Sequence, residues 1–301
     1  MHPVRAPRPL ATLSEWLRCP NCFGDLQPAD TLVLSCARGH RFDVNRRGYA
    51  SLIAGSRRLI GDSPAMLDAR NAFLGNGWYA DLRDALSALV SAEPTHRVLD
   101  IGCGTGYYLR GVLAALAAKP PASATDTPAV PRALAVDLSA PAVARTVRAA
   151  VAVPGTTTDG LVADVWSPLP IRDAATDVII NVFAPRNPAE FHRVLAPGGL
   201  LAVVVPHPTH LQELRADGLA LDVHENKSAD QVASLSGLFE LEQTRDLSTV
   251  LSLSPADVTA LIGMGPSAHH KKAAADGVDS PAARRPVTVA FQLLAFRRNS
   301  S

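Results

Sequence analysis

The chain has 301 residues, of which 47% are hydrophobic and 19% are charged, and its formal net charge is +1. This length accommodates one large domain and a small one. No apolar run reaches about 18 residues, so we expect no membrane span, and the first residues lack the apolar core of a secretory signal. Four cysteines do not suggest a disulfide scaffold. We therefore expect a cytoplasmic protein with no membrane partner.

The charge is unevenly distributed. Residues 1–60 contain nine arginines and four acidic residues, a net charge of +5, which leaves −4 for the remainder. A basic segment on a mildly acidic body favours a polyanion as the partner of that segment. The alternative is an ordinary solvated surface.

A group of metal-ligating residue types lies near the start of the chain. Cys19 and Cys22 form a C-x2-C pair, and Cys36 and His40 form a C-x3-H pair, with a short predicted strand over 31–34 between them. Thiolates and imidazole at this spacing suit one tetrahedral zinc ion in a zinc ribbon. Four ligands leave no position for water, so we expect a structural metal. The alternative is free thiols and a surface histidine.

The segment that follows the ribbon mixes aromatic and basic residues. We expect Phe42, Val44 and Tyr49 to pack on the metal lobe, with Arg46 and Arg47 facing solvent. Aromatic residues interleaved with arginines suit RNA, by stacking and by phosphate contact. A small core with a solvated edge is an equally good interpretation of the composition.

Two helices are predicted next, after a basic link over 55–61. Asp62-Ser63-Pro64 is typical of a helix start, because it offers a capping side chain and a proline at the first position. The helices are expected over 65–74 and 78–90. They should cover the ligand-binding side of the following sheet or form the seam with the metal lobe.

The stretch from Val98 to Tyr108 indicates a strand, a glycine-rich turn and the start of a helix. Asp100 precedes Gly102, Gly104 and Gly106, which gives G-x-G-x-G rather than the dinucleotide fingerprint G-x-G-x-x-G. This run resembles the first motif of class I S-adenosylmethionine-dependent methyltransferases. The resemblance implies an acidic residue near the methionine end of the cofactor, with the glycines passing under ribose and methionine. Alternatives are another nucleotide-binding loop or a plain βα turn.

Two further acidic residues follow predicted strands. After a helix over 107–118 and a proline-rich insertion over 119–131, the strand 133–137 ends in Asp137, a candidate acceptor for both ribose hydroxyls. The alternative is a helix N-cap, for which Ser139 competes. Asp164 follows a third strand over 161–163, and in this family that position commonly lies near the adenine amino group.

The rest of the chain continues the alternation of strands and helices. A fourth strand is predicted over 178–183, a helix over 187–195 and a fifth strand over 200–205, after the sharp stop Ala196-Pro197-Gly198-Gly199. The predicted tail comprises a helix near 228–235, a strand near 239–251, a helix over 255–262 and a last strand over 286–296. The two tail strands should pair antiparallel at the sheet edge. The fold class expected is α/β, a Rossmann-like doubly wound sheet of the class I methyltransferase type with an N-terminal zinc ribbon.

The pairing of this ribbon with this core is similar to one family, the bacterial 23S rRNA (guanine-N1)-methyltransferases, and within it to the tylosin-resistance branch. The matching stretches are 19–49, 75–79, 98–108, 181–188, 210–214 and 264–267. Departures are the 119–131 insertion and a polar loop over 267–284. The resemblance implies zinc on Cys19, Cys22, Cys36 and His40, and S-adenosylmethionine against Tyr79, Gly104, Thr105 and His210. The residues alone favour other interpretations, Tyr79 as a seam aromatic and His210 as a residue at a helix start, and it is the resemblance that favours a cofactor role for both.

The resemblance implies transfer of a methyl group to N1 of a guanosine in a 23S rRNA hairpin lining the peptide exit tunnel. The expected domains are a zinc-ribbon RNA-recognition domain (1–55), a helical linker (56–92) and the methyltransferase domain (93–301). Asn181, at the end of strand four, is a candidate contact to the target base, and Phe183 a candidate stacking residue. Rival hypotheses are a small-molecule methyltransferase with a ribbon lid and an inactive zinc-ribbon RNA-binding protein. The sequence does not decide the oligomeric state, for which a homodimer is one option.

Overall fold

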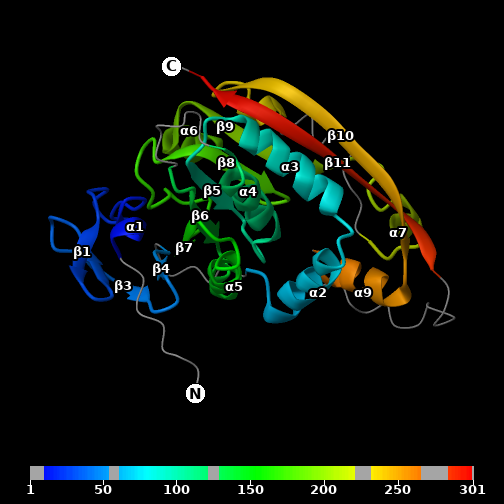
Figure 1. The fold of residues 1–301 in the computed structure, drawn as a ribbon, viewed down its shortest axis with the longest axis horizontal. Helices are drawn as coiled ribbons and strands as arrows, with labels where there is room; N and C mark the ends of the chain where they lie inside the picture. Colours follow the sequence, from blue (N-terminus) through cyan, green and yellow to red (C-terminus); the bar gives the residue numbers. More distant parts are fainter. Residues whose placement is uncertain (1–9, 54–60, 121–128, 221–231, 266–283, 300–301) are drawn as a thin grey trace.

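The computed structural model describes residues 10–53, 61–120, 129–220, 232–265 and 284–299 (Figure 1). At its centre is a parallel sheet, whose strands stand in the spatial order β7 (Thr157–Val162), β6 (Arg132–Asp137), β5 (Arg97–Ile101), β8 (Thr176–Val182) and β9 (Leu195–Pro206). The chain runs outward from β5 to β7, then crosses to the other side of β5 for β8. This reversal creates a switch point between β5 and β8, where ligands bind beyond the carboxyl ends of the strands.

The last two strands form the far edge of the sheet. β10 (Phe239–Leu253) and β11 (Arg285–Arg298) pair antiparallel, and β11 pairs antiparallel with β9. They run as a long ribbon along one side of the molecule (Figure 1). The predicted doubly wound sheet and its antiparallel edge pair are both confirmed.

Helices cover both faces of this sheet. They are α1 (Leu10–Ser14), α2 (Pro64–Gly75), α3 (Ala80–Ala92), α4 (Tyr107–Ala117), α5 (Ala140–Ala150), α6 (Pro188–Val194), α7 (Gln212–Ala216) and α9 (Pro255–Gly263). The predicted start of α2 is confirmed, because Ser63 accepts a hydrogen bond from the Met66 N–H at 3.3 Å and Pro64 is the first helical residue. In the described part of the chain, no helix is both long and apolar enough to span a bilayer.

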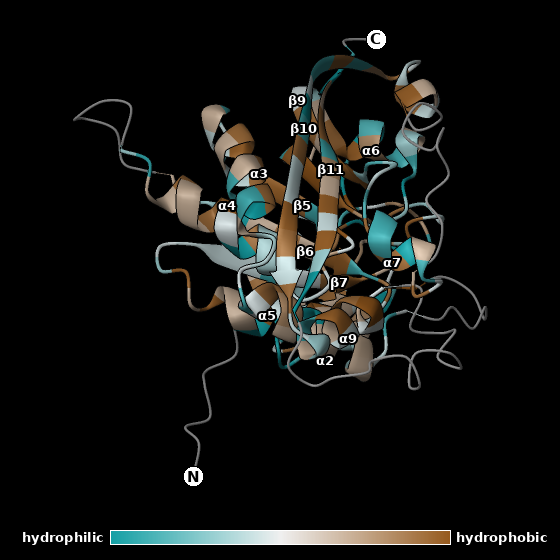
Figure 2. Ribbon diagram, turned by 90° about the vertical axis from the view of Figure 1, so that its right-hand side faces the viewer, coloured by the Kyte–Doolittle hydropathy of each residue, from teal (hydrophilic) through white to brown (hydrophobic). Residues whose placement is uncertain are grey.

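Two hydrophobic clusters fill the spaces above and below the sheet. Successive residues of β5 divide between them: Val98 belongs to the cluster that includes α3 and α4, and Leu99 to the cluster that includes α1, α6 and the N-terminal lobe. The central strands are accordingly brown in Figure 2. Because α3 and the end of α2 join the first cluster, these helices cover the α4 side. The alternative that they form the seam with the metal lobe is wrong.

The N-terminal lobe is built from short antiparallel strands, β1 (Gln27–Asp30), β2 (Val33–Ser35), β3 (Arg41–Asn45) and β4 (Tyr49–Ser51). The strand predicted over 31–34 is partly wrong, because residues 31 and 32 form the turn of the β1–β2 hairpin. Phe42 and Val44 pack in the cluster that contains Cys19 and Cys36, as predicted, and the side chains of residues 46 and 47 are exposed.

One connection joins this lobe to the central sheet. β4 pairs in parallel with β7, with Tyr49 opposite Gly160 and Ser51 opposite Val162. Tyr49 packs against the α3–α4 cluster, and its predicted place on the metal lobe is wrong. The lobe and the central sheet share one continuous array of strands.

Two strand boundaries differ from the predictions. β7 begins at Thr157 rather than at residue 161, because its polar residues Thr158 and Asp159 are buried beneath α1, where Asp159 accepts a hydrogen bond from Thr12 at 3.1 Å. β9 begins at Leu195, directly after α6, and an irregular register separates this start from the predicted segment at 200. The link 55–60, most of the 119–131 and 267–284 segments and the start of the helix at 228–235 lie outside the described residues. Residues 232–235 are helical.

Candidate functional site

The glycine loop lies at the switch point, between the end of β5 and the start of α4. Gly102, Gly104 and Gly106 have φ angles of 82°, 52° and 71°, a region that side chains other than glycine rarely adopt. A Cβ on Gly102 would lie 2.3 Å from the Ala184 Cβ, and a Cβ on Gly106 would lie 2.7 Å from the Thr146 Cγ2. Glycine at these two positions therefore lets the loop pack closely on Ala184 and Thr146, and the helix N-terminus that follows it is capped by no side chain.

Two carboxylates flank this loop. Asp137, at the end of β6, accepts hydrogen bonds from the Gly104 N–H at 3.0 Å and from the Ser139 N–H at 2.8 Å. Ser139 caps α5 by accepting from the Ala142 N–H, so the helix-cap role belongs to Ser139 and not to Asp137. Burial, and then repulsion from Asp137, raise the pKa of the Asp100 carboxyl to about 8. Burial likewise raises the pKa of Asp137. Paired buried carboxylates of this kind favour a ligand that brings hydroxyl donors and positive charge.

An aromatic wall is formed around Tyr79 and Phe291. The Tyr79 ring lies edge to face with Phe73 and Phe291, at centroid distances of 5.1 and 4.8 Å. Its hydroxyl is buried and has no hydrogen-bond partner among the described residues, and burial raises its pKa. An orphaned buried hydroxyl is costly, and it points to a polar ligand atom as its partner.

His210 belongs to the same wall. Its ring centroid lies 4.8 Å from that of Phe291, and its Nδ1 accepts a hydrogen bond from the Ala290 N–H at 3.2 Å. Burial, and then the charge of Arg215, lower the pKa of His210 to about 4, so the ring is neutral at pH 7. Because Nδ1 is an acceptor, Nε2 carries the proton and is a donor.

The other two predicted cofactor contacts lie on loops. Thr105 is buried within the glycine loop, and its carbonyl accepts a hydrogen bond from Arg110. Asp164 turns both carboxylate oxygens toward its own loop, where they accept from the Trp166 N–H and the Ser167 hydroxyl, each at 3.0 Å.

Both candidate catalytic residues lie where β8 ends. Asn181 is fully buried, and its amide donates to the carbonyls of Ile101 and Pro185 at 3.2 and 3.1 Å. Phe183 is 44% exposed, and its φ of 54° is rare for a bulky side chain. Its ring centroid lies 5.4 Å from that of Phe291. Such local strain occurs most often at functional sites.

Three side chains at this site were not among the predicted site residues. Phe291, on β11, contacts the rings of Tyr79, Phe183 and His210, yet no motif surrounds it. The guanidinium of Arg70 would lie 3.0 Å from a Cβ on Gly104, while it pairs with Asp62 and donates to the Met264 carbonyl at 2.8 Å. The third, Arg186, donates to the Asn181 side-chain oxygen at 3.1 Å. Of these three, only Arg186 lies in a stretch, 181–188, that matched the family in the sequence analysis.

The predicted metal ligands converge. Ligand atoms of Cys19, Cys22, Cys36 and His40 all lie within 4.8 Å of one another. The Cys22 and Cys36 sulfurs are 3.6 Å apart, and the His40 Nδ1 lies 3.3 Å from the Cys36 sulfur. Tetrahedral zinc–thiolate geometry places sulfurs about 3.8 Å apart, so the cluster is compatible with a zinc ribbon.

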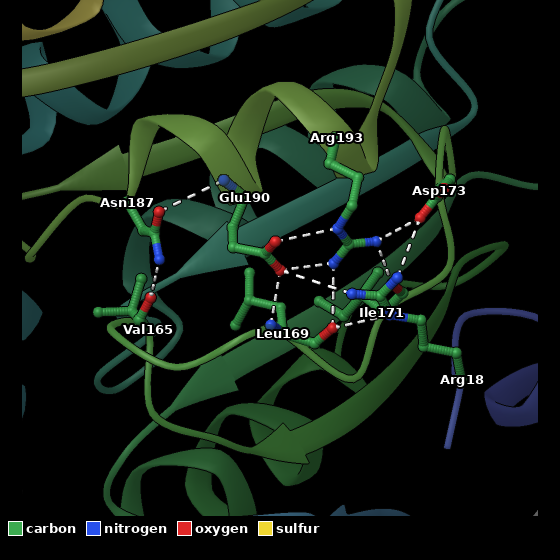
Figure 3. A network of polar contacts seen from close by, with 8 residues as sticks. All are labelled: Arg18, Val165, Leu169, Ile171, Asp173, Asn187, Glu190 and Arg193. Carbon is green, nitrogen blue, oxygen red and sulfur yellow. Dashed lines mark hydrogen bonds and ion pairs between the residues drawn. The ribbon is translucent and has the colours of Figure 1, made fainter. Parts of the chain in front are cut away.

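The N-terminal lobe is docked on the central sheet and its loops through arginines. Figure 3 shows the Arg193 guanidinium between Glu190 and Asp173, with Arg18 entering from the lobe. Arg18 donates to the Leu169 carbonyl at 3.2 Å and pairs with Asp173 at 3.3 Å. From the core side, Arg172 donates to the Leu17 and Leu26 carbonyls, at 3.0 Å each. These bonds, together with the β4–β7 pairing, fix the cluster relative to the central sheet.

Two proteins of known name match most of the chain in sequence. No protein-family model matches the chain. It is 38% identical over 261 residues to the 23S rRNA (guanine(748)-N(1))-methyltransferase of Streptomyces fradiae, which covers 85% of this chain and 86% of that protein. It is 36% identical over 321 residues to a protein of Micromonospora griseorubida that bears the name 23S rRNA (guanine-N(1)-)-methyltransferase provisionally, with 99% of each chain covered. Among solved structures the overall likeness is distant: YcgJ of Bacillus subtilis has a TM-score of 0.46 at 17% identity, over 72% of this chain and 98% of that one.

The Micromonospora griseorubida protein matches 99% of the chain, so the match includes the cysteine–histidine lobe, the glycine loop and the loop after β8. With identities of 36% and 38% over 99% and 85% of its length, the chain belongs to the family of 23S rRNA (guanine-N1)-methyltransferases.

Proposed function

We propose that the protein transfers a methyl group from S-adenosylmethionine to N1 of a guanine in 23S rRNA. The observation that carries this proposal is the relationship to the Streptomyces fradiae enzyme, whose name specifies guanine 748. We assign the same position to this chain, in the hairpin that lines the peptide exit tunnel. Methylation there would confer resistance to tylosin-type macrolides, and the enzyme would act in the cytoplasm on its ribosomal substrate.

The residues at the switch point fit S-adenosylmethionine, which supplies an electrophilic methyl group on a sulfonium. The Asp137 carboxylate would accept from the ribose hydroxyls, and Asp100 would face the positively charged methionine end. The orphaned Tyr79 hydroxyl and the His210 Nε2–H are donors suited to the cofactor's carboxylate. Gly102, Gly104, Thr105 and Gly106 would supply backbone, and Asp164 would lie near the adenine.

The protein's own contribution to catalysis is alignment, because a sulfonium is a good leaving group. The target guanine must leave its base stack to reach the methyl group. We assign Phe183 to stacking on this base, which its exposure and strained backbone support. Asn181 acts through the loop that it holds rather than by touching the base, since its polar atoms already bond Ile101, Pro185 and Arg186.

We assign the N-terminal lobe to zinc binding and RNA recognition. Arg38, Arg41, Arg46 and Arg47 are all exposed on it, and the exposed Phe23 ring lies 4.6 Å beneath the Arg18 guanidinium. Exposed cations bind phosphates, and exposed rings stack on bases. The zinc would be structural, held by Cys19, Cys22, Cys36 and His40.

The test is methyl transfer from labelled S-adenosylmethionine to 23S rRNA that lacks this modification. N1-methylguanine blocks base pairing, so reverse transcription should stop next to guanine 748. A stop at another guanine would correct the assigned position. Cofactor binding without incorporation into RNA would instead favour a small-molecule substrate.

A further inference from the structure

The loop that follows β8, residues 183–187, lies directly against the glycine loop. The Ala184 Cβ occupies the space that a side chain on Gly102 would need, at 2.3 Å. Phe183, which opens the loop, is held at a φ of 54°. The loop is therefore packed closely against the cofactor side of the switch point.

Asn181 ties this loop to the cofactor strand. One amide nitrogen donates both to the Ile101 carbonyl, directly before Gly102, and to the Pro185 carbonyl within the loop. The amide oxygen accepts from the Arg186 guanidinium at 3.1 Å. A fully buried side chain thus fixes the position of one arginine relative to the end of β5.

The charge of Arg186 is not neutralised within the described part of the chain. No carboxylate there lies within ion-pair distance of it, and its recorded hydrogen bond is to a neutral amide. Nearby Arg18 and Arg193, by contrast, both pair with Glu190 and Asp173. Arg186 is half-buried, and a desolvated cation without a counterion is costly unless an anion joins it. An anionic partner is therefore expected from a ligand.

N1-methylation of guanine creates such an anion. N1 carries a proton near neutral pH, and its loss leaves negative charge that spreads onto O6. Resting on the proposed function, we propose that Arg186 is a catalytic residue that donates to O6 of the target guanine and stabilises its N1-deprotonated form. A guanidinium matches O6 as a planar donor.

The N1 proton passes to water, and the negative charge of the base rests on N1 and O6 beside Arg186. The N1 lone pair then forms the bond to the methyl carbon, while the carbon–sulfur bond breaks and its electron pair returns to sulfur. The products are neutral N1-methylguanine, a neutral thioether and one released proton. With Arg186 lowering the pKa of N1, solvent is a sufficient base.

The experiment measures single-turnover methylation of unmodified 23S rRNA between pH 6 and pH 9. Wild type is compared with Arg186→Lys, Arg186→Ala and Arg148→Ala, the last removing an exposed arginine on α5. We expect the single-turnover rate of Arg186→Ala to be about 10²–10³-fold lower than that of wild type at pH 7, the range found when a charge-stabilising donor is removed. The loss should shrink as pH rises, because hydroxide increasingly ionises N1 without help. The rate of Arg186→Lys should lie between those of wild type and Arg186→Ala. Added guanidinium ion should partly restore the rate of Arg186→Ala, and Arg148→Ala should have the same rate as wild type.

Other outcomes overturn the assignment. An equal loss at every pH, without guanidinium rescue, would make Arg186 a structural residue, as would a matching fall in cofactor affinity or thermal stability. An inactive wild type would refute the proposed function itself. If the wild type is active and Arg186→Ala has the same rate and the same pH profile, only the role of Arg186 is refuted.

Discussion

Tyr49 of the N-terminal lobe and Gly160 of the central sheet lie opposite each other in parallel register, so the strands of the lobe continue directly into the central sheet. A Cβ on Gly160 would lie 2.7 Å from the Tyr49 Cβ and 2.5 Å from the Val143 Cγ1. The absence of a side chain at residue 160 lets β4 and α5 approach β7 together. The orientation of the lobe relative to the cofactor site therefore depends on this one close contact and on the arginines that surround Leu169.

Replacing Gly160 with alanine should destabilise the protein by about 1–3 kcal/mol, the usual cost of overpacking a core. Both neighbours are held by the sheet and by α5, so neither can withdraw freely. Denaturant unfolding would measure the change. Gly75→Ala is the matched control, because nothing lies within 4 Å of a Cβ there and its backbone is helical. Equal stability of the two variants would show that β4 is not fixed on β7.

Loss of zinc should disable RNA binding while leaving the cofactor site intact. The metal-ligand cluster belongs to the hydrophobic cluster on one face of the sheet, whereas Tyr79 belongs to the other. Structural zinc contributes roughly 10–16 kcal/mol in small finger peptides, more than a lobe with so little core can replace. We expect one zinc per chain by elemental analysis, none in Cys22→Ser, and normal S-adenosylmethionine binding in that variant.

Cys103→Ala is the control for this zinc experiment, since Cys103 is the remaining cysteine and lies outside the cluster. It should retain its zinc and its RNA affinity. A Cys22→Ser protein that binds 23S rRNA as tightly as wild type would separate the lobe from RNA recognition.

The sequence predicted most of this architecture, because its strands are strongly apolar and its turns carry glycine and proline. It could not predict the pairing of β4 with β7. Tyr49–Ser51 is too short for a recognisable pattern, and its partner lies more than a hundred residues away in sequence. Phe291 was missed for a related reason. It lies within an apolar strand and gains its role only because β11 brings it beside Tyr79 and His210.

The Tyr79 hydroxyl should matter for the cofactor and not for the fold. Because it is buried without a partner among the described residues, its removal in Tyr79→Phe should leave stability unchanged or raise it. The same change removes a donor to the cofactor and should weaken S-adenosylmethionine binding by about 1–3 kcal/mol, roughly 5–150-fold. Calorimetric titration and thermal unfolding measure the two effects. A destabilised Tyr79→Phe with unchanged cofactor affinity would make Tyr79 a seam aromatic only.

His210 should make the protein sensitive to mild acid. Its pKa is about 4 in the folded chain and about 6.5 when unfolded, so between these values the unfolded state binds a proton that the folded state refuses. Stability is therefore complete above pH 6.5 and falls as pH drops toward 4, by up to about 3 kcal/mol. His210→Asn keeps an acceptor for the Ala290 N–H without the titrating ring, and should lose less stability between pH 7 and pH 4.5. Parallel urea curves for both proteins across this range would contradict the assignment.

Trp166 should contact the RNA. It is 67% exposed, the largest exposed fraction among the exposed large hydrophobic side chains of the described chain. Its loop is held in place, because Asp164 accepts from the Trp166 N–H and Asn187 donates to the Val165 carbonyl at 3.0 Å. That second bond joins it to the loop that carries Phe183. An exposed indole on a loop whose backbone is held in this way suits stacking on an RNA base, which is worth about 1–3 kcal/mol.

Trp166→Ala should therefore weaken binding of the 23S rRNA hairpin about 5–150-fold, while Trp166→Phe keeps most of the affinity. Hairpin addition should quench tryptophan fluorescence in wild type but not in Trp166→Phe, whose remaining Trp16 is buried and whose Trp78 donates to Asp257. Val250→Ala, on the exposed edge strand β10, is the control and should bind RNA normally. If Trp166→Ala instead weakens S-adenosylmethionine binding and spares the hairpin, the indole covers the cofactor's adenine and RNA stacking at this position is ruled out.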